Sequence, residues 1–360
     1  AADYYGKDDN YVTGEADSPG LEWGGKGATK VGLTGKAEPG DFKAVLSGEH
    51  KLFADQEKAG AGSDGKHRAG WDLTFSAPKS VSLAILVGGD KKLDIAHDRA
   101  VNRAMAYAEK HFAITRVREQ GKIKEVKTGN LIYAQTVHGT SRKGDPQRHT
   151  HVVVANATVE PGTGKVRAVE SLQLFKHSNL LGRIYQAELA KEAIKLGYDV
   201  RRDREQGTIE LGGVSRDQLQ RFSKRNTDIR AAIDQEEKRR GTKLSPAQRD
   251  AVALRDRPKK LDVPRSELVI RWEKEAKDAG LDMGRLVADS RERGGHGTDV
   301  TPQVSGVASD SISRFIAAMK DMVGRFKESS SDPYGYKPGL PFGRDQDARA
   351  AVSFGLQHAE

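Results

Sequence analysis

The stretch DPQRHTHVVVAN, residues 145–156, carries two histidines at the start of an apolar run. Side chains two positions apart in a β-strand point to the same face, so His149 and His151 share a face with Val153. The intervening threonine and the other valines take the opposite face. The pattern therefore predicts a strand over residues 149–159, one face of which begins with a pair of imidazoles.

A third histidine closes the preceding predicted strand, GNLIYAQTVH (129–138), and a turn-rich loop of ten residues joins the two strands. If they pair antiparallel, His138 falls opposite His149 or His151, where opposed Cβ atoms lie about 4.5–5.5 Å apart. Three neutral imidazoles with open coordination positions form a common type of catalytic metal site. The alternative is that the three share a sheet face for other reasons. A cupin-type site is set aside, because residues 152–156 offer no carboxylate.

Asp72 lies inside another predicted strand, WDLTF (71–75), between a tryptophan and a leucine. A carboxylate within an apolar strand costs free energy unless it is paired. Metal-bound histidines usually donate their second ring N–H to such an acceptor. Asp72 is therefore the candidate partner of one histidine, and an edge-strand position in solvent is the alternative.

Helices accompany these strands. Residues 90–112 carry apolar side chains at helical spacing, and residues 179–197 predict a second helix. Residues 198–211 predict a hairpin. Polar helices follow, opened by capping-box patterns at Ser215 and Ser245.

The composition indicates which partners the protein could bind and which kinds of site it cannot contain. The 360 residues carry a net charge of +9, which favours polyanions and nucleic acid first, although a generic basic protein is the alternative. Lys and Arg outnumber Asp and Glu, 17 to 11, between residues 199 and 260. The absence of Cys excludes disulfides and thiolate metal sites. We find no secretory signal and no apolar run of membrane-spanning length. The missing initiator Met suggests a fragment or a processed form of a longer protein.

Three of the nine tyrosines, Tyr4, Tyr5 and Tyr11, lie within DYYGKDDNYV near the N-terminus. Such a cluster usually packs a chain end. A phenol has a pKa near 10 and attacks phosphate poorly at neutral pH unless a metal or a basic group stabilises the phenolate. Attack on a DNA phosphate would give a phosphotyrosine ester, which conserves the energy of the broken bond, so strand joining would need no ATP.

Five stretches in this order carry a family resemblance: DYYGKDDNY, LEWGGKGATKVGLTG, HRAGWDLTFSAPKSVSLAIL, GNLIYAQTVHGTSR and DPQRHTHVVVAN. Over residues 1–290 the chain resembles the relaxase domain of MobF-family conjugative relaxases, which belong to the HUH endonuclease class. The resemblance implies an α+β fold with an antiparallel β-sheet palm flanked by helices. It also implies helical fingers, at about residues 215–285, which close over single-stranded DNA. Residues 291–360 are then expected to be a linker and the start of a truncated helicase-like region, and a first sheet strand upstream of Tyr4 is expected to be missing.

The resemblance also implies an activity. Such domains nick one DNA strand at a plasmid's origin of transfer, keep the 5′ end on a tyrosine, and rejoin it to end conjugative transfer. The implied nucleophile is Tyr4, with Tyr5 as the runner-up, and Tyr11 matches a tyrosine of later strand transfer. Tyr11 is followed by Val12, whereas relatives often carry two tyrosines there. The implied metal ligands are His138, His149 and His151, and Asp72 orients one of them and assists the nucleophile.

The expected cofactor is a divalent metal ion, Mg²⁺ or Mn²⁺. Imidazole suits Mn²⁺, Ni²⁺ and Zn²⁺ better than it suits Mg²⁺, which prefers oxygen, so the protein could purify with Zn²⁺ or Ni²⁺. The resemblance implies single-stranded plasmid DNA, relaxosome accessory proteins, a coupling protein and a type IV secretion machinery as partners. It implies the bacterial cytoplasm as location, followed by transfer into the recipient cell with the DNA.

Six basic residues are candidate DNA contacts. One lies at a predicted helix start, where backbone N–H groups bind phosphate. Two flank the loop beside the histidines, and three lie in the fingers. Trp23 could stack on a base or pack in the core. The six are Lys79, Arg142, Arg148, Arg221, Lys224 and Arg225.

Three other functions remain open at this point. A rolling-circle replication initiator uses the same chemistry, although the order of the motifs argues against it. A basic fragment could bind single-stranded DNA without cleaving it. A metal-dependent hydrolase would let water attack and form no covalent adduct.

Overall fold

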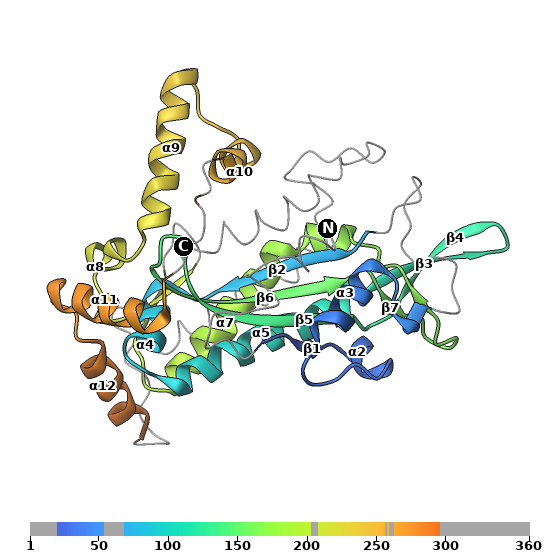
Figure 1. Ribbon diagram of the computed structural model, residues 1–360, viewed down its shortest axis with the longest axis horizontal. Coiled ribbons are helices and arrows are strands. Elements are labelled where there is room, and N and C mark those ends of the chain that lie inside the picture. The colour runs from blue at the N-terminus through green and yellow to red at the C-terminus, as the bar shows by residue number, and fades with distance from the viewer. Residues whose placement is uncertain (1–19, 54–67, 203–207, 256–257, 259–262, 296–360) are drawn as a thin grey trace.

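The computed structural model describes residues 20–53, 68–202, 208–255, 258 and 263–295 (Figure 1). Its centre is a four-stranded sheet in the order β1-β5-β6-β2, in which every neighbouring pair is antiparallel. The antiparallel palm predicted from the sequence is therefore confirmed. Its strands are β1 (Glu22–Gly24), β5 (Tyr133–Thr140), β6 (Pro146–Ala155) and β2 (Gly70–Ser76).

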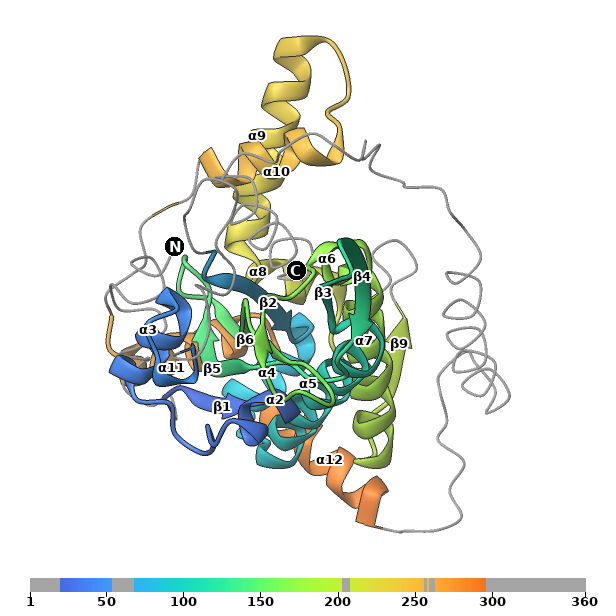
Figure 2. The same cartoon turned by 90° about the vertical axis from the view of Figure 1, so that its right-hand side faces the viewer.

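Both faces of β6 are buried against separate cores. Val152 and Val154 pack in a core with α5 (Lys91–Phe112) and α7 (Ser178–Lys195), which cover one face of the sheet (Figures 1 and 2). The helix predicted over residues 90–112 is thus confirmed as α5. The apolar positions at helical spacing are Leu93, Ala96, Ala100, Ala104 and either Tyr107 or Ala108. All of them are buried except Tyr107, which is half-buried, so Ala108 is the last core position.

The other face, which carries the histidines, packs at its far end against a smaller core. Val153 and Ala155 meet side chains of α3 (Pro39–Ser47) there, together with Ala28 of the short helix α2 (Lys26–Lys30). Trp23 packs against this core, with its ring centroid 6.1 Å from that of Phe42. Its position agrees with the packing role that we kept open beside base stacking.

The loop between the two histidine strands is shorter than predicted. β5 continues to Thr140 and β6 begins at Pro146, which pairs with Thr140 after a register irregularity. The expectation of a ten-residue loop is therefore wrong. Strand pairing overrides the local turn signal, because proline is tolerated at the first residue of a strand.

The described residues also form three two-stranded ribbons. β9 (Val200–Arg202) and β10 (Ile209–Leu211) confirm the predicted hairpin. β7 (Thr158–Val159) pairs with β8 (Val166–Arg167). β3 (Ile114–Glu119) and β4 (Lys122–Lys127) form a ribbon that projects from the body (Figure 1), and the sequence analysis did not anticipate it.

The later helices lie beside the β5–β6 loop. Trp272 Nε1 donates to the carbonyl oxygen of Gly144 in that loop over 2.7 Å. Both predicted capping boxes form, at Ser215 with Gln218 and at Ser245 with Gln248. α9 (Lys224–Arg240) and α10 (Pro246–Arg255) stand away from the sheet (Figures 1 and 2). The other described helices are α4 (Lys79–Leu86), α6 (Leu172–Lys176), α8 (Arg216–Arg221), α11 (Arg265–Asp278), α12 (Met283–Gly295) and the 3-10 turn η1 (Lys51–Phe53).

The predicted division of the chain stays a prediction. α12 continues to Gly295, so a linker can begin only after that residue and not at residue 291. The expected helicase-like segment lies outside the described residues, as do Tyr4, Tyr5 and Tyr11.

His97 is a buried histidine beneath the sheet, on the face opposite to His149 and His151. His97 is fully buried; its Nδ1 lies 2.8 Å from the hydroxyl of Tyr185 and its Nε2 lies 2.9 Å from Oγ1 of Thr150. Thr150 sits on β6 between the two histidines, on the opposite face. Burial, reinforced by Arg148, holds the pKa of His97 well below its ordinary value.

We expect this group to make the protein sensitive to acid. Because the pKa of His97 is lower in the folded state, the unfolded state binds more protons as the pH falls below about 6.5. The free energy of unfolding should then fall by up to about 1.4 kcal/mol per pH unit from this group. Urea unfolding of wild type and of His97→Gln at pH 7.5, 6.5 and 5.5 checks this, and equal pH slopes for both proteins would contradict it.

Candidate metal centre

The three histidines converge on one face of the sheet. His138 pairs directly with His149 across β5 and β6, as one of the two predicted registers requires, and His151 lies two residues farther along. The ring centroids lie 5.3 Å apart for His138 and His149, 5.1 Å for His138 and His151, and 5.0 Å for His149 and His151. One nitrogen from each ring lies within 4.8 Å of the other two.

This donor set fits a metal ion. Nitrogens bound tetrahedrally at about 2.1 Å lie roughly 3.4 Å apart, so a small inward rotation of the rings suffices. His138 is 5% exposed, whereas His149 and His151 are partly exposed. The site is therefore supported from the sheet and accessible from outside.

Two hydrogen bonds fix ring tautomers. His151 Nδ1 lies 2.9 Å from Oδ2 of Asp72, and His149 Nδ1 lies 2.9 Å from the carbonyl oxygen of Gln147. Both acceptors require a proton on Nδ1, so the Nε2 lone pairs are left to bind an ion. The Asp72 side chain is buried and reaches His151 diagonally, because its own partner across the ladder is Val153. The structure thus brings Asp72 to the histidines. β2 is an edge strand of the sheet, as the alternative assumed, but Asp72 is buried there and does not lie in solvent.

Comparison with known proteins agrees with this geometry. The sequence model described as TrwC relaxase matches residues 1–279. This chain belongs to the TrwC relaxase family. The resemblance to MobF-family conjugative relaxases that the sequence motifs indicated is therefore confirmed.

Relatives and solved structures extend the comparison. The multifunctional conjugation protein TraI of Escherichia coli is 37% identical over 318 residues, which cover 86% of this chain and 17% of TraI. The relaxase-family chain thus spans about a sixth of that relative. A metal-bound structure of the conjugative relaxase TrwC in complex with oriT DNA has a TM-score of 0.69 at 38% identity. A copper-bound complex has a TM-score of 0.68 at 39% identity, and each comparison covers 78% of this chain and 94% of the other.

Lys79 is buried within the protein and is not exposed as the expected DNA contact requires. Its side chain is buried, and its amine donates to the carbonyl oxygen of Pro146 over 3.0 Å and to Oε1 of Gln147 over 2.7 Å. The start of α4 is also occupied, because the Glu210 carboxylate accepts from the Ser80 N–H over 2.9 Å. The expected phosphate contact at this helix start is therefore wrong.

The predicted DNA contact of Arg148 is also not supported by the structure. It lies on the face of β6 opposite to the histidines, and its side chain is only 4% exposed. Its guanidinium pairs with Asp94 over 2.5 Å and with Asp98 over 2.8 Å, both on α5. These two carboxylates compensate its charge inside the protein, which argues against the expected DNA contact of Arg148.

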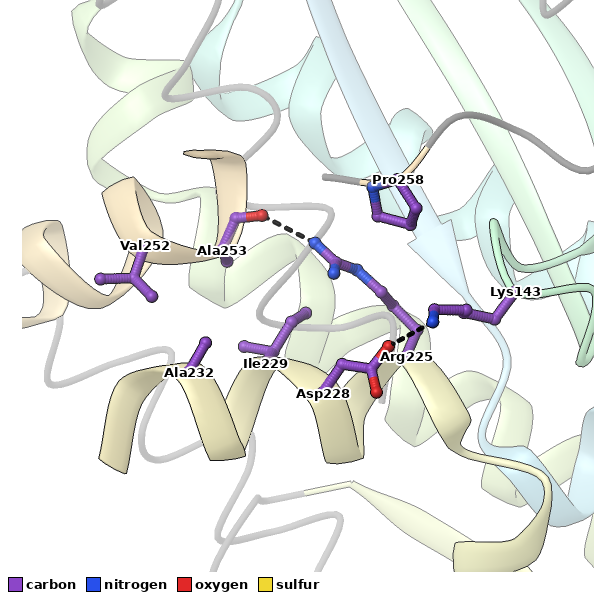
Figure 3. Close-up of a pocket in the computed structure, with 8 residues that line it drawn as sticks. All are labelled: Lys143, Arg225, Asp228, Ile229, Ala232, Val252, Ala253 and Pro258. Carbon is purple, nitrogen blue, oxygen red and sulfur yellow. Dashed lines mark hydrogen bonds and ion pairs between the residues drawn. The ribbon is translucent and has the colours of Figure 1, made fainter. Parts of the chain in front are cut away.

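The finger cations are largely engaged with the protein. Lys224 binds Glu275 over 2.8 Å and Asp145 over 3.2 Å. Arg225 donates to the carbonyl oxygen of Ala253 over 2.7 Å across a small pocket between α9 and α10 (Figure 3). Contacts of Lys224 and Arg225 with DNA stay predictions that require these bonds to be shared or exchanged.

The other two predicted contacts differ in their surroundings. Arg142 donates to the carbonyl oxygen of Pro258 over 3.3 Å, and Arg221 is exposed at the end of α8. DNA contacts of Arg142 and Arg221 stay predictions.

The sequence analysis missed two polar residues beside the histidines, Thr74 and Gln147. Thr74 lies opposite His151, with Oγ1 3.0 Å from its Nδ1, and polar residues alternating with Asp72 along β2 were the available signal.

Proposed function

We propose that this chain is the DNA-nicking domain of a conjugative relaxase. It would cleave one plasmid strand at the origin of transfer through a covalent 5′-phosphotyrosine and later rejoin it. The observation that carries this proposal is the convergence of three imidazoles on one sheet face, with Asp72 behind one of them. TrwC is known in complex with oriT DNA, and TraI is a conjugation protein.

We assign one group of residues to metal binding and one tyrosine to the attack on DNA. His138, His149 and His151 would hold a divalent ion, with Asp72 fixing the His151 ring. When bound, the ion withdraws charge from a non-bridging phosphate oxygen and orients the phosphate. The Tyr4 oxygen attacks phosphorus and loses its proton, and the bond to the 3′ oxygen breaks. The 3′ oxygen leaves as a hydroxyl, so the exchange of one ester for another needs no external energy.

The ion is proposed to be Mg²⁺ or Mn²⁺ in cells. A set of three imidazoles binds Mn²⁺, Ni²⁺, Zn²⁺ or Cu²⁺ more readily than Mg²⁺. One TrwC complex with oriT DNA is copper-bound and another is metal-bound, and both support a metal ion at the corresponding site of this chain.

The further partners and the location follow from the same proposal. Single-stranded plasmid DNA is the substrate, and relaxosome accessory proteins, a coupling protein and the type IV secretion machinery are the proposed partners. We place the protein in the bacterial cytoplasm before transfer to the recipient. Among the helices that the structure describes, none is long and apolar enough to cross a membrane.

A denaturing gel separates this function from its alternatives. The protein is mixed with Mn²⁺ and a labelled single-stranded oligonucleotide that contains the cognate nick site. A shifted, protease-sensitive band that EDTA prevents is expected. Cleaved DNA without a shift would favour hydrolysis, and intact DNA would leave only a binding protein. Cleavage of replication-origin DNA in preference to transfer-origin DNA would favour a rolling-circle initiator.

Replacing Asp72 by Asn should weaken metal binding. The amide cannot provide the charged acceptor that holds the His151 ring, and loss of such a partner typically costs about 10–100-fold in metal affinity or activity. We therefore expect a Mn²⁺ dissociation constant at least about tenfold higher, measured by calorimetry. Asp217→Asn on α8 serves as the control of equal charge change, and equal affinities of the two variants would contradict the role of Asp72.

The β3–β4 ribbon is a proposed contact for double-stranded DNA. The major groove admits a two-stranded ribbon, and the exposed cations of this one include Arg118, Lys122 and Lys127. Ile123 is 65% exposed beside them. One TrwC complex contains a 27-mer that comprises the recognition hairpin and the cleavage site, and a hairpin stem would offer such a groove.

Charge reversal in the ribbon should separate hairpin binding from cleavage. We expect Arg118→Glu with Lys122→Glu to weaken binding of a hairpin-containing oligonucleotide by roughly tenfold at physiological salt, because phosphate contacts carry much of the affinity. Cleavage of a saturating short single strand should be unchanged. Fluorescence anisotropy measures the first effect, and Lys91→Glu with Lys92→Glu on α5 is the control. Equal hairpin affinities of the two double variants would refute the contact.

A further inference from the structure

Lys79 is a buried lysine to which the proposed cleavage reaction gives no role. We propose that Lys79 and Gln147 form a positioning pair that fixes the His149 ring for metal binding. This inference rests on the proposed metal site and names residues that support it from outside the ligand set. Neither residue would touch the ion or the DNA.

Burying the charged amine of Lys79 costs free energy. It is 4% exposed at the first turn of α4, and burial lowers the pKa of its amine to about 8, against the opposing influence of Asp145 and Glu210. A buried ammonium is tolerated only when its donors are satisfied. Here two of them reach consecutive residues at the start of β6, the carbonyl oxygen of Pro146 and the side chain of Gln147.

Gln147 connects Lys79 to the ring of His149. Its Oε1 accepts from Lys79 over 2.7 Å and its Nε2 donates to the carbonyl oxygen of Ala77 over 3.2 Å, so both ends of the amide are held. The residue is 3% exposed. Its own main-chain oxygen accepts from His149 Nδ1 over 2.9 Å. The position of one peptide group therefore decides the tautomer and direction of the His149 ring.

The neighbouring backbone is held to the same corner of the fold. The Ala77 N–H donates to the Arg148 carbonyl oxygen over 2.8 Å, and the Arg148 N–H donates to Oγ of Ser82 over 3.1 Å. The passage from β2 to α4 thus fixes residues 146–148 from one side. Asp72 supports His151 directly, and Lys79 supports His149 through Gln147, so two ligands have separate supports.

Metal titration of the intact chain tests the pair without measuring cleavage. Mn²⁺ binding is measured by calorimetry for wild type, Lys79→Met, Gln147→Met and the double variant. Each single change should raise the dissociation constant about tenfold, the lower end of the usual effect of such supports. The double variant should be no weaker than the weaker single variant, because both changes break one chain of contacts. Lys91→Met, an exposed lysine at the start of α5, is the matched control and should bind as wild type.

A nitrogen NMR spectrum of the metal-free protein gives a second measurement. The His149 ring should carry its proton on Nδ1 in wild type and should populate both tautomers in Lys79→Met. A purely structural role of Lys79 would lower the melting temperature but leave both the Mn²⁺ affinity and the tautomer unchanged below it.

The outcomes separate this inference from the proposed function. If wild type binds no Mn²⁺ at the histidines, the metal site itself fails. If wild type binds one ion and the single variants bind it equally well, only the positioning pair is refuted. If Lys79→Met does not fold, Gln147→Met decides the question alone, because it leaves the buried amine its bond to Pro146.

Discussion

His149→Ala is expected to abolish DNA cleavage while it leaves most of the DNA affinity. The change removes one of three ligands, and the ion supplies several kcal/mol of stabilisation to the charge that develops on the phosphate. A loss of at least about a hundredfold in rate, or about 2.7 kcal/mol, follows. We expect DNA binding to rest mainly on phosphate contacts outside the histidine site. Single-turnover cleavage and a gel-shift titration measure the two quantities separately.

His111→Ala is the matched control for this variant. His111 lies near the end of α5 and stacks on Tyr107, away from the triad, so its loss should change neither quantity. If His149→Ala lost cleavage and DNA affinity in equal proportion, the separation of metal site from DNA-binding surface would be wrong.

Tyr4→Phe is expected to eliminate the covalent protein–DNA adduct. Phenylalanine lacks the attacking oxygen, and nothing else in the proposed chemistry forms a stable bond to the 5′ phosphate. The shifted band on a denaturing gel should fall below detection, a loss of at least about a thousandfold, while Mn²⁺ affinity remains that of wild type. Tyr4 lies outside the described residues, so this experiment tests an assignment made from sequence motifs alone.

Tyr5→Phe and Tyr11→Phe are the companions that make the result specific. Tyr11→Phe should keep the first cleavage, because its proposed role comes in later strand transfer. An adduct that survives Tyr4→Phe and disappears in Tyr5→Phe would reassign the nucleophile to the runner-up. An adduct that survives all three changes would refute tyrosine attack.

The candidate site could be predicted because it depends on local periodicity. A two-residue repeat fixes the common face of His149 and His151, and a hairpin connection brings His138 opposite to them. The family motifs supplied the fold class and the metal role. The buried carboxylate of Asp72 could be identified as a partner because an apolar strand around it leaves it no solvent.

Contacts with residues far away in the sequence explain the corrections of Arg148 and Lys79. Arg148 follows the histidine loop in sequence, but its charge is compensated by Asp94 and Asp98, about fifty residues earlier on α5. Lys79 is enclosed by residues near 146, across the sheet corner. Nothing in the sequence around either cation indicates such partners, so a basic residue near a predicted site was taken for a surface residue.

The most direct test of the metal centre is anomalous diffraction from crystals grown with Mn²⁺. We predict one strong peak on the histidine face of the sheet, within bonding distance of ring nitrogens of His138, His149 and His151, and its absence in His149→Ala. A peak elsewhere, or electron density with one of the three rings turned away from the ion, would contradict the account.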